Sequence, residues 1–241
     1  MEFGVSGRLW KNAFIMFDRQ TDTFWSHITG ESVDGPLKGK TLKVASQVST
    51  IPRIRFGDWK KQFPESKVLS VNGRSESQNR YVGYMMQPVV GIGTSAPVDD
   101  QRMPHKDLIL GITIGKGALA YPLETFPENH ILLDKKAPEP VLVFFDAGSG
   151  AAAAYEPRVG DIPLEFGSKS KDFKVVDTTT GSTWNLLLGE AVEGMLKGKR
   201  LPVHPVKEIY WGAWVDYYPK TYLYDSGIEK KETKIEGGKD E

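Results

Sequence analysis

Three polar side chains in the first third of the chain are of the types that carry acid–base chemistry. His27 lies two residues after Trp25 on an expected strand, so the imidazole and the indole share one face. Glu31 follows six residues after Trp25, and an acid buried beside an indole has a raised pKa that suits a general acid. Together with Arg19 as an anion-binding group, these residues would form the site of a hydrolase or lyase on a small polar or glycan substrate.

The surroundings of Glu31 also fit a structural role. The same Gly-Glu step recurs at Glu190, six residues after Trp184, and two related halves of one chain seldom need two identical active sites. A carboxylate at such a corner accepts backbone amide hydrogen bonds or pairs with a following lysine such as Lys38. We favour this interpretation, assign no catalytic residue, and keep Arg19, His27 and Glu31 as candidates.

Ligand-binding residues are sought where the two halves of the chain differ. Arg8, Trp10 and Asn12 have no clear counterpart in the second half, and with Trp25 they are the candidate ligand-binding residues. A small anionic or sugar-like ligand would be held by the polar cluster of Arg19, His27 and Glu31. The alternative, which we favour, is that they are solvent-facing residues of a surface sheet.

An internal repeat indicates the architecture. Shifting the chain by 159 residues aligns 18–44 with 177–203, and 13 of the 27 aligned residues are identical. Residues 2–4 and residues 165–167 both have the sequence EFG. The sequence predicts a short helix with aromatic residues on one face at both 56–63 and 211–218. The Lys-Gly-Lys of "LKGK" occurs in both copies, so we interpret its glycines, Gly39 and Gly198, as a backbone bend rather than a phosphate contact.

The repeat predicts a mainly β protein with a few short helices, made of two related β-rich units of which the first is incomplete. We expect a truncated first unit over 1–70, a connector over 71–106 and a complete second unit over 107–224. A charged tail over 225–241 is expected to be disordered. Within the second unit, 107–123 predicts a hairpin that turns at 115–117.

Composition narrows the classes of function. Lysine plus arginine and aspartate plus glutamate are both 31, so no excess positive charge favours nucleic acid. Cysteine is absent and the histidines lack metal-ligand spacing, so we expect no metal and no cofactor. No apolar run reaches the roughly 18–20 residues of a membrane span, and the first residues do not read as an export signal.

The run "FGVSGRLWKNAFIMFDRQTDTFWSHITGESVDGPLKGKTL" resembles the bacterial family known as domain of unknown function 3179. The resemblance continues through "DWKKQFPESKVLS", "LILGITIGKGALAYPL" and "GSTWNLLLGEAVEGMLKGKRL", and it covers most of residues 2–224. It implies tandem copies of one β-rich unit and favours a periplasmic or extracytoplasmic location. It implies no activity, and the Cys-Pro-x-Cys-type segment that family members carry upstream is not found in these residues.

The function that we expect is a non-enzymatic binding or assembly module, an accessory subunit of an extracytoplasmic or membrane-associated complex. A truncated β unit leaves an unpaired sheet edge, and such an edge invites a strand from a protein partner. The hydrolase or lyase is the alternative.

Overall fold

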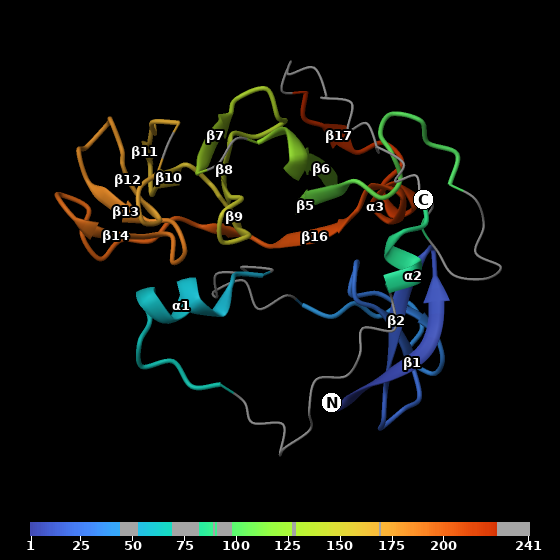
Figure 1. Cartoon of the computed structure of the whole chain (residues 1–241). Helices are drawn as coiled ribbons and strands as arrows, with labels where there is room; N and C mark the ends of the chain where they lie inside the picture. The colour runs from blue at the N-terminus through green and yellow to red at the C-terminus, as the bar shows by residue number, and fades with distance from the viewer. Residues whose placement is uncertain are drawn as a thin grey trace, which may run out of the picture.

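The computed structural model describes residues 1–43, 53–68, 82–88, 90, 98–126, 129–168 and 170–225. Most of the expected connector and the expected tail after residue 225 lie outside these residues. The chain is mainly β, as the sequence predicts, with short helices and several small sheets (Figure 1).

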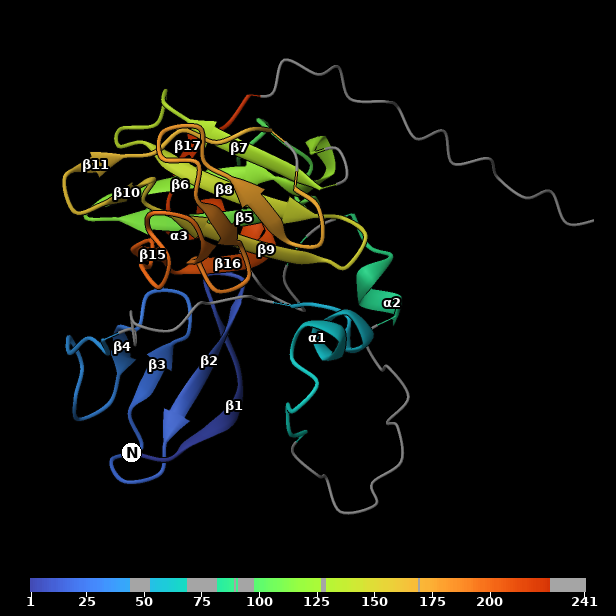
Figure 2. The same cartoon turned by 90° about the vertical axis from the view of Figure 1, so that its left-hand side faces the viewer.

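The N-terminal sheet is antiparallel, in the order β1-β2-β3-β4. Its strands are β1 (Phe3–Trp10), β2 (Ala13–Asp18), β3 (Phe24–Ser26) and β4 (Ser32–Asp34). Strand β1 is an outer strand and has an irregular register between Val5 and Arg8. Figure 2 shows this sheet as a separate layer beneath the main body of the molecule.

Two four-stranded sheets form the main body. One has the order β16-β5-β6-β17, with β5 (Leu108–Ile114), β6 (Gly117–Pro122), β16 (Val206–Tyr210) and β17 (Tyr222–Leu223). The other has the order β15-β9-β8-β7, with β7 (His130–Asp134), β8 (Val141–Asp146), β9 (Ala151–Tyr155) and β15 (Val203–His204). The hairpin of β5 and β6 confirms the predicted turn at 115–117.

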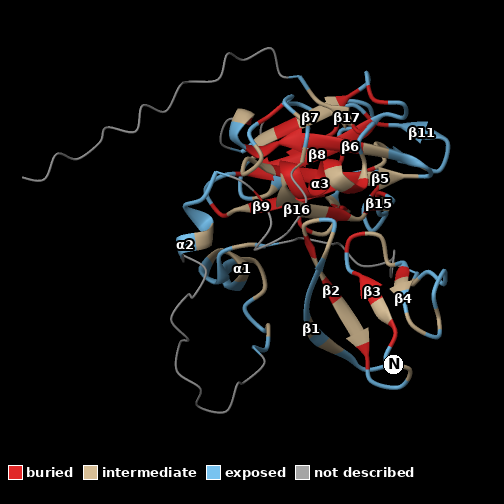
Figure 3. Cartoon of the chain, turned by 90° about the vertical axis from the view of Figure 1, so that its right-hand side faces the viewer, coloured by how far each residue is buried: buried red, intermediate tan, exposed pale blue. Residues whose placement is uncertain are grey.

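The two sheets pack face to face over an apolar core, and β15 runs almost directly into β16, which joins them. Every residue of β8 and β9 is buried, which explains why both strands are apolar or small-residue runs apart from Asp146 at the end of β8. In Figure 3 these central strands are coloured as buried, whereas much of β1 is exposed.

A smaller sheet covers the other face of β8 and β9. It has the order β12-β13-β14, with β12 (Lys174–Val176), β13 (Thr183–Asn185) and β14 (Glu190–Glu193). A two-stranded ribbon, β10 (Arg158–Val159) and β11 (Ile162–Pro163), lies beside it. Trp184, Leu186 and Leu187 pack from this smaller sheet and the turn after β13 against Leu142 and Phe144 of β8.

The helices are α1 (Phe56–Gln62), α2 (Val82–Met85) and α3 (Trp211–Tyr217), with a 3-10 turn, η1 (Leu123–Thr125), after β6. Helix α3 lies on β5 and β6 through Trp211 and Trp214, both fully buried. A Cβ at Gly111 of β5 would lie 2.6 Å from the Trp214 ring, so only glycine admits the indole at this distance.

The bend predicted at "LKGK" is present in both copies. Gly39 has φ +84° and Gly198 has φ +81°, in the left-handed region that favours glycine. No atom outside the neighbouring residues lies within 4 Å of a Cβ built at either glycine, so the backbone angle rather than crowding explains them.

Candidate functional site

The first site to consider surrounds Trp25, because sequence analysis names it as a candidate. Trp25 is 2% exposed, and its indole N–H donates to Asp18 Oδ2 at 2.9 Å. Thr21 donates to the same carboxylate from its backbone N–H, at 2.7 Å, and from its hydroxyl, at 2.7 Å. Burial alone would raise the pKa of Asp18, but the hydrogen bonds from Trp25 and Thr21 hold it below its usual value.

The same bonds occur around Trp184 in the second half. Its indole N–H donates to Asp177 Oδ2 at 2.9 Å, and Thr180 donates to this carboxylate from its N–H at 2.5 Å and its hydroxyl at 2.8 Å. An aromatic ring packs edge-on against each indole, Phe3 at 6.4 Å and Phe166 at 6.3 Å between ring centroids. Trp25 therefore belongs to the interior of the N-terminal sheet and offers no open ring face to a ligand.

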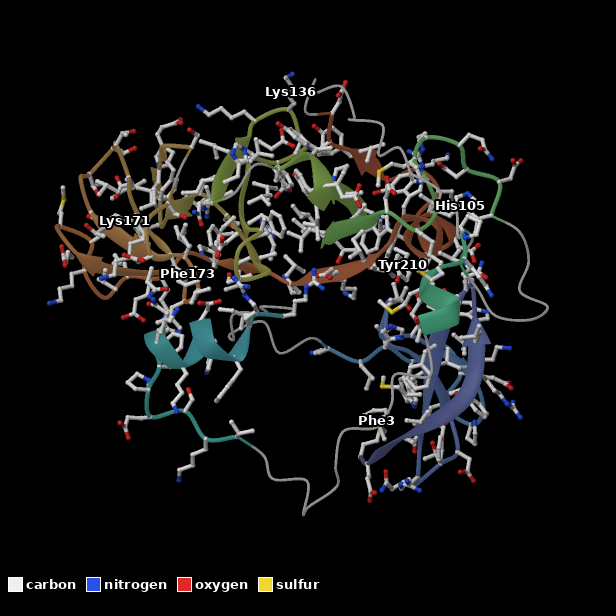
Figure 4. The ribbon with its side chains drawn as sticks, in the orientation of Figure 1. Phe3, His105, Lys136, Lys171, Phe173 and Tyr210 are labelled. Carbon is white, nitrogen blue, oxygen red and sulfur yellow. The ribbon has the colours of Figure 1, made fainter. Side chains whose placement is uncertain are left out.

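A cavity of about 1110 Å³ lies between the N-terminal sheet and the main body. Its walls come from β1, the turn between β1 and β2, His27, α2, β16 and α3. Its charged and polar lining residues are Arg8, Asn12, His27, Arg53 and Glu208, and its aromatic ones are Phe14, Tyr84 and Tyr210. Figure 4 labels Tyr210 at this junction, beside α2.

Two oppositely charged side chains meet on one wall of the cavity. Arg53 Nε lies 3.0 Å from Glu208 Oε2, and the Glu208 side chain is only 10% exposed. Burial raises the pKa of Glu208 above its ordinary value, although the Arg53 charge acts in the opposite direction. Glu208 is thus a carboxyl group that is protonated more easily than a surface glutamate.

Arg8 of β1 is the second arginine that lines the cavity. It lies 4.7 Å above the ring of Phe24, and it forms no ion pair with any residue in the part of the chain that the structure describes. Arg53 is paired with Glu208, whereas Arg8 has no acidic partner among the described residues. The Arg8 guanidinium lies on the face of the sheet opposite to Leu9 and Phe14.

His27 presents its ring to the same cavity. Its Nδ1 lies 2.5 Å from the carbonyl oxygen of Phe14, so the neutral tautomer with the proton on Nδ1 fits this contact. Partial burial lowers the pKa of His27, the bond to Phe14 raises it, and the nearby charge of Lys207 lowers it further. The net shift is downward, which favours a neutral imidazole with Nε2 as an acceptor.

Trp10 and Asn12 join the N-terminal sheet to α3. Asn12 Nδ2 donates to Asp216 Oδ2 at 2.9 Å, and Tyr217 donates its hydroxyl hydrogen to the carbonyl oxygen of Trp10 at 2.7 Å. The rings of Trp10 and Tyr217 also pack edge-on with centroids 5.5 Å apart. Asn12 lines the cavity as well, whereas Trp10 does not.

The catalytic candidates Arg19, His27 and Glu31 are not brought together in this cavity, because only His27 lines it. Arg19 follows the end of β2, where its Nε pairs with Glu2 Oε1 at 3.0 Å. The register pairs Phe17 with Phe24 and Ile15 with Ser26, so Arg19 and His27 lie at opposite ends of the hairpin.

Glu31 is an exposed residue at a corner of the sheet, where it forms a β-bridge with Thr41. Its expected ion pair with Lys38 is absent from the described residues. The equivalent Glu190 accepts from Arg200 Nη2 at 2.7 Å instead. The aligned residue in the first half is Thr41, which explains why only one of the two glutamates has this partner.

The cavity also contains Arg53, Tyr84, Glu208 and Tyr210, which no sequence pattern above indicates. The available signal was Glu208, a carboxylate within the strand sequence "VKEIY". Among the described residues no three histidine or acidic side chains are grouped as metal ligands, and no helix is long and apolar enough to cross a membrane.

Comparison with known proteins identifies a family whose function is unknown. A family model described as "Protein of unknown function (DUF3179)" matches residues 1–221. No curated protein and no solved structure matches the chain.

Proposed function

The chain belongs to the DUF3179 family, whose function is unknown, and we propose a role for it from the geometry of the structure. It is a non-enzymatic binding or assembly module that takes up a partner strand at the edge of β1. In this proposal it serves as an accessory subunit of an extracytoplasmic or membrane-associated complex. In the same proposal its two halves derive from an internal duplication.

The duplication is supported by bonds that recur between the halves. The three bonds to Asp18 from Trp25 and Thr21 recur at Asp177 from Trp184 and Thr180. The two helices end alike: Phe63 N–H bonds Trp59 O at 2.9 Å, and Tyr218 N–H bonds Trp214 O at 3.0 Å. The ring pairs of these same residues have centroids 4.4 Å apart in both helices.

The equivalent helices differ in what covers them. Six residues of α3 are buried, whereas α1 has none. Trp211 is 0% exposed, whereas Phe56 at the equivalent position is 54% exposed. Similar local sequence thus gives the same helix, but among the described residues α1 has no counterpart of the β5–β6 sheet beneath α3.

The observation that carries the proposal is the outer edge of β1. In the second half, the equivalent segment is bonded on that side by β7 and the residue before it: Ile131 N–H donates to Ser168 O at 3.0 Å, and Ser170 N–H donates to Asn129 O at 3.3 Å. In the first half, β1 pairs only with β2 among the described residues, and Val5 is 79% exposed. An exposed strand edge of this kind pairs readily with another chain.

A synthetic peptide of residues 129–135, the segment that covers the equivalent edge, tests the proposal. At millimolar concentration it is expected to slow amide hydrogen exchange in β1 of the intact protein. A matched peptide with N-methyl groups on alternate residues, which cannot form the strand ladder, is expected to leave β1 unchanged. Equal exchange in β1 with and without the unmodified peptide would argue against strand uptake.

A second candidate function is a hydrolase or lyase on a small polar or glycan substrate. The observation that favours it is that Glu208 has a raised pKa and His27 a lowered pKa, and that both line one cavity, as an acid and a base require. Its test is hydrolysis of fluorogenic glycosides and esters by wild type, Glu208→Gln and His27→Gln. Turnover that either variant abolishes would establish the enzyme, and no turnover by wild type would remove it.

A further inference from the structure

We propose that the partner strand at β1 runs antiparallel to it and carries an acidic side chain opposite Arg8, followed by alternating apolar side chains. This inference rests on the strand uptake proposed above and adds the direction and the chemistry of the partner.

The direction follows from the second half of the molecule. The two bonds between 129–131 and 168–170 run in opposite senses, from Ile131 N–H to Ser168 O and from Ser170 N–H to Asn129 O. This reciprocal pair is the pattern of antiparallel strands. Ser168 follows the "EFG" at 165–167 as Val5 follows the "EFG" at 2–4, so a strand placed in the same way covers β1 at Val5.

The acidic side chain follows from the charges that face the edge. Arg8 lines the cavity and has no acidic partner among the described residues, whereas Arg53 is paired with Glu208. The downward pKa shift of His27 leaves its ring without a charge at neutral pH. A carboxylate on the incoming strand would compensate Arg8 through a charge-assisted hydrogen bond, and repulsion would disfavour a basic residue at that place.

The apolar side chains follow from exposed apolar surface around the same edge. Val5 is 79% exposed and Leu9 is 39% exposed, both on β1, and Met85 of α2 is 55% exposed on the facing wall. All three line the cavity, together with Ile209 of β16. Side chains alternate between the two faces of a strand, so the apolar ones would lie on the face of Val5 and Leu9, and the acidic one would lie on the other face, where the Arg8 guanidinium stacks on Phe24.

The position of the acid along the partner is fixed by the antiparallel direction. Arg8 lies near the C-terminal end of β1, so the residue opposite it belongs to the N-terminal part of the incoming strand. The C-terminal end of that strand then lies near Phe3, which Figure 4 labels at the lower end of the N-terminal sheet. A partner of about seven residues covers the eight residues of β1.

Two peptides that differ at one side chain test the inference. The probes are Ac-TEITVTV-NH2 and its glutamine counterpart Ac-TQITVTV-NH2, added to the full chain. Each is also attached to the N-terminus through a short Gly-Ser linker, which raises its local concentration to the order of millimolar. Affinity is measured by titration, and pairing is measured by amide exchange in β1.

The glutamate peptide is expected to bind about fivefold more tightly than the glutamine peptide, as for a partly exposed ion pair, and added salt should reduce the difference. Arg8→Gln is expected to abolish the preference. Arg158→Gln is the matched control, since the Arg158 side chain is 58% exposed and lies outside the cavity. It is expected to retain the full preference.

The outcomes separate the two proposals. If both peptides protect β1 equally in wild type, the acidic partner is wrong while strand uptake stands. If neither peptide protects β1, even when attached, strand uptake and this inference both fall. Tight binding without protection of β1 would identify the cavity as a site for side chains or small molecules alone, and it too would overturn the inference.

Discussion

Helices α1 and α3 differ in how deeply the rest of the protein buries them, and replacing the aromatic residue at the equivalent position of each helix measures this difference. Trp211 of α3 is 0% exposed, its indole N–H donates to Asp100 Oδ1 at 3.2 Å, and Arg102 lies 4.9 Å from its ring. Removing a buried aromatic side chain of this size costs about 3–5 kcal/mol of unfolding free energy, because a cavity remains. We therefore expect Trp211→Ala to lose about that much.

Phe56 of α1 is the matched control, because it occupies the equivalent position and is 54% exposed. Phe56→Ala is expected to change the unfolding free energy by only about 0.5 kcal/mol, as surface substitutions do. The assay is urea unfolding followed by far-ultraviolet circular dichroism at one protein concentration. Losses of similar size in the two variants would refute the reasoning, because α1 would then be packed as tightly as α3.

Three further outcomes are expected. Gly198→Ala should lower the unfolding free energy in urea by about 1–2 kcal/mol, because Gly198 has a left-handed backbone angle. Lys197→Ala should lower it by no more than about 0.5 kcal/mol. The reverse order would contradict a purely structural role for the "LKGK" segment. Tyr217→Phe should lower the unfolding free energy by about 1 kcal/mol and speed amide exchange at residues 10–13, because the hydrogen bond from the Tyr217 hydroxyl to Trp10 is lost. Unchanged exchange at these residues would mean that this bond does not hold the N-terminal sheet to α3. His204 is 7% exposed, its Nε2 has no hydrogen-bond partner among the described residues, and burial lowers its pKa against the opposing charges of Glu156 and Glu139. The fold thus favours the neutral form of His204, so the contribution of this residue to stability is present above about pH 6.5 and is lost as the pH falls. The urea midpoint of His204→Gln should therefore drop less between pH 7 and pH 5 than that of wild type. An equal drop would mean that His204 is not a source of the pH dependence.

The sequence was most informative where a feature is local or repeated. Aromatic spacing predicts α1 and α3, and the glycines on either side of Lys116 predict the β5–β6 hairpin. Burial is different, because it depends on what lies opposite. Phe56 and Trp211 occupy equivalent places in equivalent helices, and only the sheet under α3 makes one of them a core residue.

The candidate site was predicted only in part. Arg8, Asn12 and His27 line the cavity, but its other charged residues, Arg53 and Glu208, come from segments 155 positions apart, and no local pattern links them. Arg19 is close to His27 along the chain, yet the β2–β3 hairpin places the two at opposite ends. Arg19 was therefore named as a candidate because it is close to His27 in sequence, although the two are apart in the structure. Glu208 was not named because it is far from Arg53 in sequence.

Amide hydrogen exchange of the purified chain can show whether the edge of β1 is open to a partner strand, by comparing β1 with the equivalent segment of the second half. We expect fast exchange at the outward-facing amide of Val5, and slow exchange at Ile131 and Ser170, whose N–H groups are bonded across the equivalent edge. A chain that is monomeric and fully protected throughout β1 would contradict this expectation, because no edge would then be open to a partner strand.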